Sequence, residues 1–332
     1  MINDLFFTHM PLDRESTNRK SELWIAEQRE NKQSKFVPMW KGDYFFTSAP
    51  NDEDKLVEFS CWSEILGITR KYSRDVKEAC YYLGRDLTHA PSQIFIVDLS
   101  LVISNLAQAI IDISSFIAKE IRLLGFRQSI AFLAKEHAST LGYGRSLSNW
   151  HQSAQFCGCC GNKTLSQEGG HSRLCTEQSC RQLSFPRTDP VVIMLVEYKE
   201  KGQPTKCLLA AHKRSPEHLF STIAGFVDPG ESLEQAVIRE VHEEVGLEVK
   251  EVEYMASQPW AFPNSLMIGF YVKAKSNTIT IDTEELTNAS WFTVEEVKSF
   301  SDWGEENNNI QIPRKESISR CLIEHWLSRN TD

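Results

Sequence analysis

The stretch that most constrains the fold runs from Gly225 to Leu247 and reads GFVDPGESLEQAVIREVHEEVGL. It predicts a tight loop followed by a helix, because Ser232 and Gln235 have the spacing of a capping box. Gly246 stands where a residue in the left-handed conformation ends a helix. The glycines of the loop allow its backbone to approach a ligand or a metal closely.

Acidic residues gather on one face of this predicted helix. Glu240, Glu243 and Glu244 are spaced i, i+3 and i+4, which places them side by side. Like charges repel at this spacing, so a bound cation is the natural reason to assemble them, and oxygen ligands favour Mg²⁺ or Mn²⁺. A solvated acidic surface helix is the alternative, but it leaves Arg239, the glycines and the spacing unexplained.

The same stretch resembles the Nudix box, whose fixed positions are matched by Gly225, Glu231 and the run from Arg239 to Leu247. This resemblance implies an α/β fold, the Nudix α/β/α sandwich with a mixed sheet. The apolar runs that follow residue 188 fit that order of elements. We predict strands at 191–197, 207–211, 219–226, 254–255, 266–274 and 289–293, and helices in the box, at 294–300 and at 316–328.

Four of the nine cysteines form two close pairs: Cys157, Cys160, Cys175 and Cys180. Two pairs separated by a loop predict a structural Zn²⁺ ribbon, in which four thiolates close a tetrahedral site and take no part in chemistry. Four buried free thiols are the alternative. Cys159 competes for a place but cannot supply the two-residue spacing, and we interpret His171 as a loop residue.

Residues 1–150 show little chemistry. We predict strands at 35–46 and 92–99 and helices at 77–83 and 102–126, in an α+β domain that serves as a scaffold or for dimerisation. The predicted domains are therefore an N-terminal α+β, rudimentary Nudix-like domain at 1–150, a zinc ribbon at 151–188 and a Nudix domain at 189–332.

Charge and hydropathy narrow the class of protein. A formal net charge of -9 argues against a large basic surface for nucleic acid, and anionic substrates need a metal to offset it. The most apolar stretch, 99–121, contains charged residues and has helical periodicity, so we expect no membrane segment. The N-terminus has no basic leader and the C-terminus no Ser-Lys-Leu ending, so we expect a cytoplasmic location, with the peroxisome as the alternative.

A second informative stretch, SQPWAFPNS at 257–265, follows the box. Its prolines stiffen a loop, its aromatic rings can stack on a base, and its amide and hydroxyl groups can bind a sugar or base edge. A stiff turn with core aromatics is the alternative. The stretch resembles the array of the NADH pyrophosphatases, a Nudix subfamily that also carries a zinc ribbon before its Nudix domain. Ala261 departs from the proline of that array.

The resemblance implies site residues. Metal ligands are the carboxylates of Glu240, Glu244 and Glu285 and the backbone carbonyl of Ala224, although Glu284 is an alternative to Glu285. Substrate contacts are Phe185, Phe226, Gln258, Pro259, Trp260, Ala261, Phe262, Pro263, Asn264, Ser265 and Ser319.

The implied activity is hydrolysis of the pyrophosphate bond of NADH or NAD⁺ to AMP and nicotinamide mononucleotide, with removal of the NAD cap from RNA as an extension. We expect two or three Mg²⁺ or Mn²⁺ ions, one Zn²⁺ per chain and a homodimer. Glu243 would position or deprotonate the attacking water, Arg239 would pair with a box glutamate, and Glu231 would organise the loop. Hydrolysis of another nucleoside diphosphate derivative, such as ADP-ribose, and a catalytically silent nucleotide sensor are the alternatives.

Overall fold

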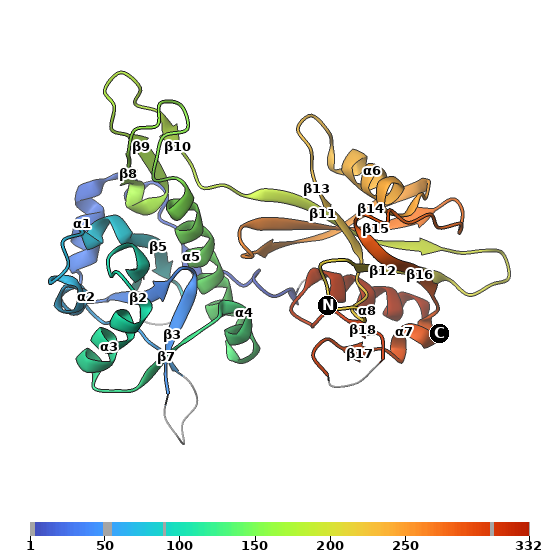
Figure 1. Cartoon of the computed structure of the whole chain (residues 1–332), viewed down its shortest axis with the longest axis horizontal. Helices are drawn as coiled ribbons and strands as arrows, with labels where there is room; N and C mark the ends of the chain where they lie inside the picture. The colour runs from blue at the N-terminus through green and yellow to red at the C-terminus, as the bar shows by residue number, and fades with distance from the viewer. Residues whose placement is uncertain (1–3, 49–54, 89–90, 306–308, 332) are drawn as a thin grey trace. The chain divides into compact units, whose positions relative to one another are not determined.

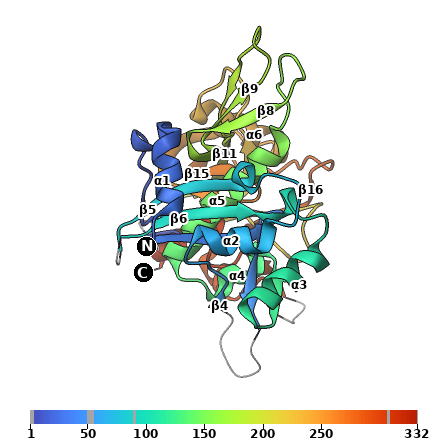
Figure 2. The same cartoon turned by 90° about the vertical axis from the view of Figure 1, so that its left-hand side faces the viewer.

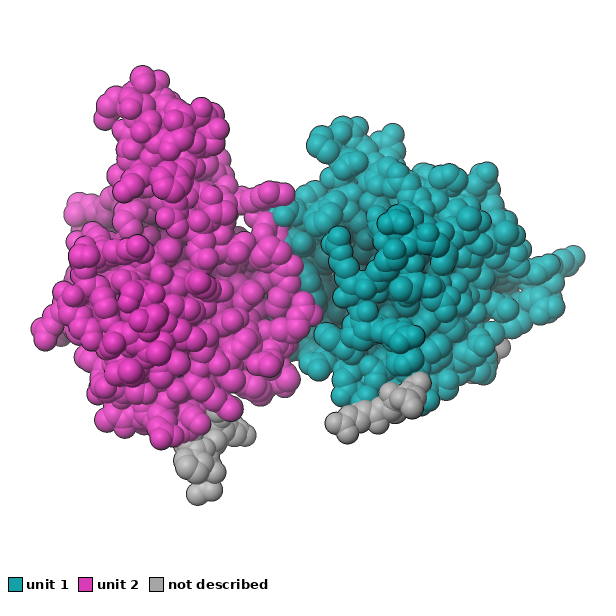
Figure 3. All heavy atoms as spheres, in the orientation of Figure 1, with its two compact units in different colours: residues 1–8, 188–260, 265–332 teal, residues 9–187, 261–264 magenta. Residues whose placement is uncertain are grey.

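The computed structural model describes residues 4–48, 55–88, 91–305 and 309–331 of the chain. The chain forms two compact units, which Figure 3 shows in different colours. The N-terminal unit comprises His9–Arg187 and Ala261–Asn264. The C-terminal unit comprises Met1–Thr8, Thr188–Trp260 and Ser265–Asp332.

The described part of the N-terminal unit contains a seven-stranded mixed sheet with helices packed on it (Figures 1 and 2). The helices bury Trp62, Ile65 and Ile113 against Phe36 and Phe95 of the sheet. The strand order is β1-β5-β6-β2-β3-β4, with β7 paired to β3. The strands are β1 (Leu12–Asp13), β2 (Ser34–Trp40), β3 (Asp43–Thr47), β4 (Lys55–Leu56), β5 (Cys80–Asp86), β6 (Gln93–Asp98) and β7 (Ile121–Leu124). The helices are η2 (Asn18–Lys20), α1 (Glu22–Glu30), α2 (Trp62–Thr69), η3 (Val76–Ala79), η4 (Leu99–Leu101), α3 (Leu106–Ile117), α4 (Phe126–Ser129), η5 (Ile130–Phe132) and α5 (Lys135–Ser153).

Three predictions for this unit need correction. The run at 35–46 is a hairpin, because Lys41 and Gly42 have φ values of 51° and 90° and turn the chain between β2 and β3. The helix predicted at 77–83 is wrong, since β5 begins at Cys80 and lies within the sheet. The helix predicted at 102–126 is shorter, because Ala118 adopts a φ of 54° and ends α3.

A small antiparallel sheet follows α5 in the N-terminal unit, with the strand order β10-β9-β8. Its elements are β8 (Thr164–Gln167), η6 (Glu168–Gly170), β9 (Ser172–Cys175) and β10 (Leu183–Ser184). The Nε2 atom of His171 donates to the carbonyl of Tyr82 at 2.8 Å, and the backbone N–H of Glu168 donates to the carboxylate of Glu22 at 3.1 Å. The structure thus groups the predicted ribbon with the preceding domain.

The C-terminal unit contains a six-stranded mixed sheet between two helices (Figure 1). Its strand order is β14-β15-β11-β12-β16, with β13 paired to β11, and β11 runs parallel to β15. Helix α6 packs on Val192 and Met194 of one face, and α8 packs on Ile193 and Leu195 of the other. The strands are β11 (Asp189–Tyr198), β12 (Lys206–His212), β13 (Ile223–Phe226), β14 (Val249–Trp260), β15 (Ser265–Ala274), β16 (Leu286–Phe292), β17 (Ser301–Asp302) and β18 (Gln311–Ile312). The helices are α6 (Leu233–Val245), α7 (Val294–Lys298) and α8 (Ile318–Asn330). This is the predicted α/β/α sandwich.

The N-terminal residues pack in the C-terminal unit rather than in the domain that follows them. Leu5 is buried in the core between the sheet and α8, and the carbonyl of Phe6 accepts a hydrogen bond from Gln258 at 2.9 Å. These contacts join residues some 250 positions apart. Domains predicted as continuous segments of the sequence therefore could not include them. Within the described ranges, every helix is too short or too polar to cross a membrane.

Candidate functional site

Helix α6 and the loop before it build the candidate active site. The Ser232 hydroxyl accepts from the N–H of Gln235 at 3.3 Å, and the Gln235 side chain accepts from the N–H of Ser232 at 2.7 Å. Gly246, at a φ of 69°, ends the helix. Because Val237 and Val241 are buried against the sheet, the rotation of the helix, and so the direction of its carboxylates, is fixed.

Arg239 is the centre of a network that joins the helix to the loop. Its guanidinium donates to Glu231 at 2.6 and 3.1 Å, to Glu240 at 2.8 Å and to Glu243 at 2.9 Å. It also donates to the backbone carbonyl of Phe226 at 2.9 Å. All five guanidinium N–H donors are therefore used. The sequence predicted one glutamate partner for Arg239, and the structure describes three.

Glu231 has the position of a loop organiser. One of its carboxylate oxygens accepts from the N–H of Asp228 at 2.8 Å, and both bind Arg239. These hydrogen bonds, that from Arg239 first, lower the pKa of Glu231. The carboxylate therefore stays ionised and holds the loop against α6.

Gly225 lies so close to the helix that no side chain fits there. A Cβ atom built on Gly225 would lie 1.9 Å from the carboxyl carbon of Glu240. The glycine of the box therefore has a steric reason, since it leaves room for the carboxylate beside strand β13.

Glu244 is the most unusual group of the site. It is only 2% exposed, yet neither of its carboxylate oxygens has a hydrogen-bond partner among the described residues. Burial, followed by the charges of Glu240, Glu285 and Asp282, raises its pKa to about 8. Burial also raises the pKa of Glu240. An unpaired buried carboxylate is costly, so this arrangement fits a bound cation that supplies the missing partner.

Glu285 lies near these two carboxylates, because its charge contributes to the raised pKa of both Glu240 and Glu244. The backbone N–H of the neighbouring Glu284 donates to the side chain of Asp282 at 2.8 Å.

Two neighbours of the carboxylates, Asp282 and His212, are not among the predicted site residues. The backbone N–H of Asp282 donates to the carbonyl of Glu244 at 2.9 Å, which brings a fourth acidic side chain to the site. His212 lies at the end of β12. Burial lowers its pKa, and the charge of Glu285 offsets part of this shift. Asp282 stands in the same acidic run as Glu285 and could have been found, whereas nothing in the sequence marks His212.

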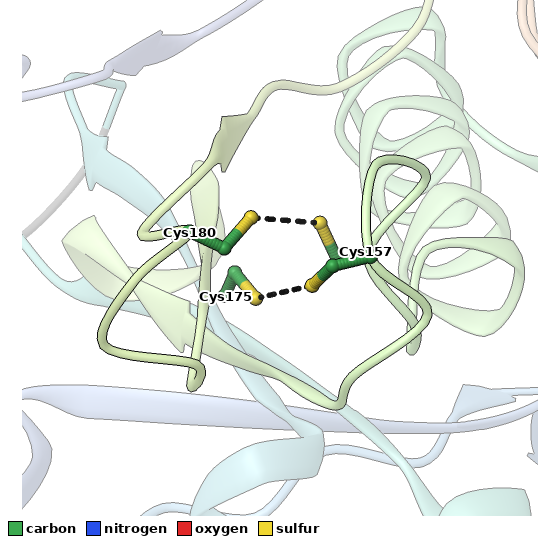
Figure 4. A group of neighbouring side chains, drawn as sticks. Cys157, Cys175 and Cys180 are labelled. Atoms are coloured by element: carbon green, nitrogen blue, oxygen red, sulfur yellow. Dashed lines mark hydrogen bonds between the residues drawn. The ribbon is translucent and has the colours of Figure 1, made fainter.

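The cysteine cluster is the second candidate site. The sulfur atoms of Cys157, Cys160, Cys175 and Cys180 all lie within 4.8 Å of one another. Figure 4 labels three of these side chains, Cys157, Cys175 and Cys180, which point toward one another. The sulfurs of Cys157 and Cys180 are 3.8 Å apart, and those of Cys160 and Cys175 are 3.4 Å apart. In the described ranges the carboxylates form no comparable group of three.

The donor set and its surroundings suit a metal that takes thiolate ligands. The backbone N–H groups of Cys159 and Cys160 lower the pKa of Cys157 to about 6, which favours its thiolate, whereas burial raises the pKa of Cys175 to about 12. Cys159 itself is exposed and lies outside the cluster, and His171 is bound to Tyr82 instead. Four converging thiols suit Zn²⁺, because this ion prefers soft sulfur ligands in a set of four.

Two of the predicted substrate contacts are buried and hydrogen-bonded inside the C-terminal unit. The Gln258 amide donates to the carbonyls of Phe6 and Glu316 and accepts from the N–H of Ile318 at 2.8 Å, and Gln258 is 0% exposed. The hydroxyl of Ser319 accepts from Thr222 at 2.8 Å. Both side chains are therefore buried and hydrogen-bonded within the C-terminal unit.

The rest of the predicted substrate loop is divided between the units. Pro259, Trp260 and Ser265 belong to the C-terminal unit, where Trp260 meets Phe7 edge to face at 5.9 Å. Ala261, Phe262, Pro263 and Asn264 belong to the N-terminal unit.

Each of these four residues has a contact within the N-terminal unit. Phe262 stacks on Phe126 with the ring centroids 5.7 Å apart. The carbonyl of Ala261 accepts from Arg145, that of Pro263 from Ser146, and the side chain of Asn264 donates to Arg187.

Two exposed aromatic residues complete the predicted set. Phe226, the second residue of the box stretch, is 61% exposed in the C-terminal unit, and Phe185 is 62% exposed in the N-terminal unit. The structure thus gathers Ala224, Phe226, Glu240, Glu243, Glu244 and Glu285 around α6, and it leaves Phe185 in the other unit.

Comparison with known proteins agrees with this geometry. The model of the NUDIX domain matches residues 187–312. The chain is 42% identical to the NAD-capped RNA hydrolase NUDT12 of Homo sapiens, over 60% of this chain and 43% of that protein. It is 45% identical to Nudix hydrolase 19, chloroplastic, of Arabidopsis thaliana, over 50% of this chain and 38% of that protein.

The match to a bacterial relative spans a larger share of that relative's length. The chain is 36% identical to the NAD-capped RNA hydrolase NudC of Mannheimia succiniciproducens, over 59% of this chain and 69% of that protein. By contrast, the match spans less than half the length of the human and Arabidopsis proteins. The domain match and the bacterial relative together show that the chain belongs to the Nudix hydrolase family, in the subfamily of the NAD-capped RNA hydrolases.

Proposed function

We propose that this chain hydrolyses the pyrophosphate bond of NADH or NAD⁺ to AMP and nicotinamide mononucleotide, and that it removes the NAD cap from RNA by cleaving the same bond. The observation that carries the proposal is Glu244, a buried carboxylate with no partner for either oxygen among the described residues, beside Glu240 and Glu285. The names of the relatives support the choice of substrate.

The proposed catalytic ions are two or three Mg²⁺ or Mn²⁺. Glu240, Glu244, Glu285 and the carbonyl of Ala224 would hold them, because hard divalent cations prefer such oxygen ligands. Bound there, the ions would neutralise the diphosphate and lower the pKa of the attacking water. We further propose one structural Zn²⁺ on the four cysteines and a homodimer, as the resemblance implies.

Three further side chains, Arg239, Glu243 and Phe226, have proposed roles in orienting the carboxylates, the water and the substrate. Arg239 holds Glu240 and Glu243 in fixed orientations and ties both to the loop through Glu231. Glu243 has a side chain that is 56% exposed, so it can reach a water molecule and position or deprotonate it. Phe226 offers an exposed ring for stacking on a nicotinamide or a base.

The direct test is metal-dependent turnover. Initial rates with NADH, NAD⁺, ADP-ribose and an NAD-capped oligonucleotide should rank NAD-containing substrates first, and withdrawal of Mg²⁺ and Mn²⁺ should abolish them all. A preference for ADP-ribose would favour the alternative Nudix activity. No turnover of any of the four with either ion would contradict the proposal.

The affinity for Mg²⁺ should depend on pH. Because the pKa of Glu244 is raised to about 8, its proton competes with the ion below that pH, and the site gains affinity as the pH rises. We expect the apparent affinity for Mg²⁺ to increase up to about tenfold per pH unit from pH 6 to 8, and to level off above. Calorimetric titration measures this, and a flat profile from pH 6 to 8 would contradict the expected competition between a proton and the ion at Glu244.

Replacing Gly225 by Ala should disable the site without unfolding the protein. The new methyl group would overlap the Glu240 carboxylate and displace it by more than 1 Å, so kcat/KM for NADH should fall about a hundredfold or more. Gly125→Ala is the matched control, since its Cβ would meet nothing closer than 3.6 Å. Equal kcat/KM values for the two variants would refute the steric role of Gly225.

A further inference from the structure

A pocket lined by cationic side chains lies wholly within the N-terminal unit, and it shares no residue with the carboxylate site of α6. It has a volume of about 470 Å³, within the range of ligand-binding pockets. It lies among η3, η4, the end of α5 and strands β8 and β9, of which Figure 1 labels α5, β8 and β9. Three cationic side chains, Arg74, Lys163 and Arg173, line it.

Arg173 is a buried cation of this pocket without a carboxylate partner. It is 6% exposed and donates to the hydroxyl and carbonyl of Thr164 and to the Nδ1 atom of His151, at 2.7 to 2.8 Å. His151 is neutral, since burial lowers its pKa to about 3, and its Nε2 atom donates to Gly170. Among the described residues Arg173 forms no ion pair, although the charge of Glu78 acts on it, and three of its five N–H donors are used. A buried cation with free donors calls for an anion.

Two carboxylates also line the pocket, but both have backbone partners. Asp75 accepts from the N–H of Lys77 at 2.9 Å, and Glu78 accepts from the N–H of Ser166 at 3.2 Å. Neither forms an ion pair with Arg74, Lys163 or Arg173. The cations of the pocket therefore outnumber its carboxylates by three to two, although the chain as a whole has a net charge of -9.

An exposed aromatic ring stands beside the cationic rim. Phe156 is 61% exposed and pairs with Lys163 in an isolated antiparallel bridge. Residues that face each other in such a pair have their Cβ atoms about 5 Å apart on the same side. The ring and the ammonium group thus form one edge of the pocket.

We propose that this pocket binds the phosphate group of a nucleotide whose base stacks on Phe156. Arg173 and Lys163 supply the charge for the phosphate, and the ring supplies a stacking surface for any base. The nucleotide is either a free mononucleotide or a residue of an RNA chain. This site goes beyond the proposed hydrolysis and does not rest on the carboxylates of α6.

Binding to the full-length protein without divalent metal tests the proposal. In that state the acidic site of α6 repels phosphate, so binding reports on the pocket. The probes are AMP, followed by calorimetry, and a single-stranded RNA dodecamer labelled at its 3′ end, followed by fluorescence anisotropy. The test variant is Phe156→Ala/Lys163→Ala, and the matched control is Phe132→Ala/Lys20→Ala, which removes an exposed ring and an exposed lysine elsewhere in the same unit.

We expect the Phe156/Lys163 variant to bind the preferred probe at least about tenfold more weakly than the control, with unchanged zinc content and unchanged kcat/KM for NADH. Tight binding of AMP alone identifies a free mononucleotide as the ligand, and tighter binding of the dodecamer identifies RNA. Equal affinities of variant and control, or no binding of either probe, would overturn the proposal. Because turnover of NADH is measured separately, failure here is distinguishable from failure of the proposed hydrolysis.

Discussion

Glu244→Gln should lose turnover of NADH on the order of a thousandfold while the protein stays folded. The substitution keeps the shape of the side chain and removes only the charge that would hold a divalent ion. Steady-state rates at saturating Mg²⁺ measure the loss, and a melting curve checks the fold. Glu234→Gln is the matched control, because Glu234 lies exposed on the same helix and its carboxylate accepts from the hydroxyl of the capping Ser232 at 2.9 Å.

Stability should move in the opposite direction to activity. In protein without divalent metal, Glu244 is protonated when folded and ionised when unfolded between its ordinary pKa of 4.5 and about 8. The folded state then binds more protons than the unfolded state, so stability falls as the pH rises through this window. The Gln variant lacks this loss and should melt at the same or a higher temperature than the natural protein at pH 8. A near-normal kcat, or a clear loss of stability at pH 8, would contradict the role given to Glu244.

Cys175→Ser should remove the metal from the cysteine cluster and destabilise the N-terminal unit. Cys175 is fully buried, so no water molecule can take the place of its sulfur. Because the free energy of zinc binding is also free energy of folding, a loss of a few kcal/mol is expected, which lowers the Tm by about 10 °C for a unit of this size. Elemental analysis should find about one Zn per chain in the natural protein and much less in the variant.

Cys159→Ser provides the control for this experiment. Cys159 is exposed and lies between two members of the cluster in sequence, yet outside the group of converging sulfurs. Its replacement should leave the zinc content and the Tm unchanged. If both variants lose zinc equally, or if the natural protein carries none, the assignment of the four sulfurs as ligands is wrong.

The sequence predicted those parts of the molecule that depend on interactions between residues close together in the chain. The spacing of the carboxylates, the capping box and Gly246 all act within one helix, so α6 follows from the sequence. The four cysteines are found in the same way, since a tetrahedral site demands two short loops.

Contacts between distant residues were not predictable in this way. The side chain of Gln258 has its hydrogen-bond partners at residues 6, 316 and 318, which none of its neighbours in sequence indicates. Similarly, Cys80 begins a central strand where a helix was expected, because pairing with Val97 outweighs the local pattern. The buried Arg173 and its partner His151 also meet across 22 positions, and neither stands out in the sequence.

The central claim is that the carboxylates of α6 hold divalent ions against a diphosphate. A crystal structure with Mn²⁺ and a non-hydrolysable dinucleotide tests it most directly, because anomalous scattering locates each ion. We predict Mn²⁺ bound by carboxylate oxygens of Glu240 and Glu244 and by an oxygen of the pyrophosphate. Ions located elsewhere, with Glu244 still buried and unliganded beside a bound dinucleotide, would contradict the account.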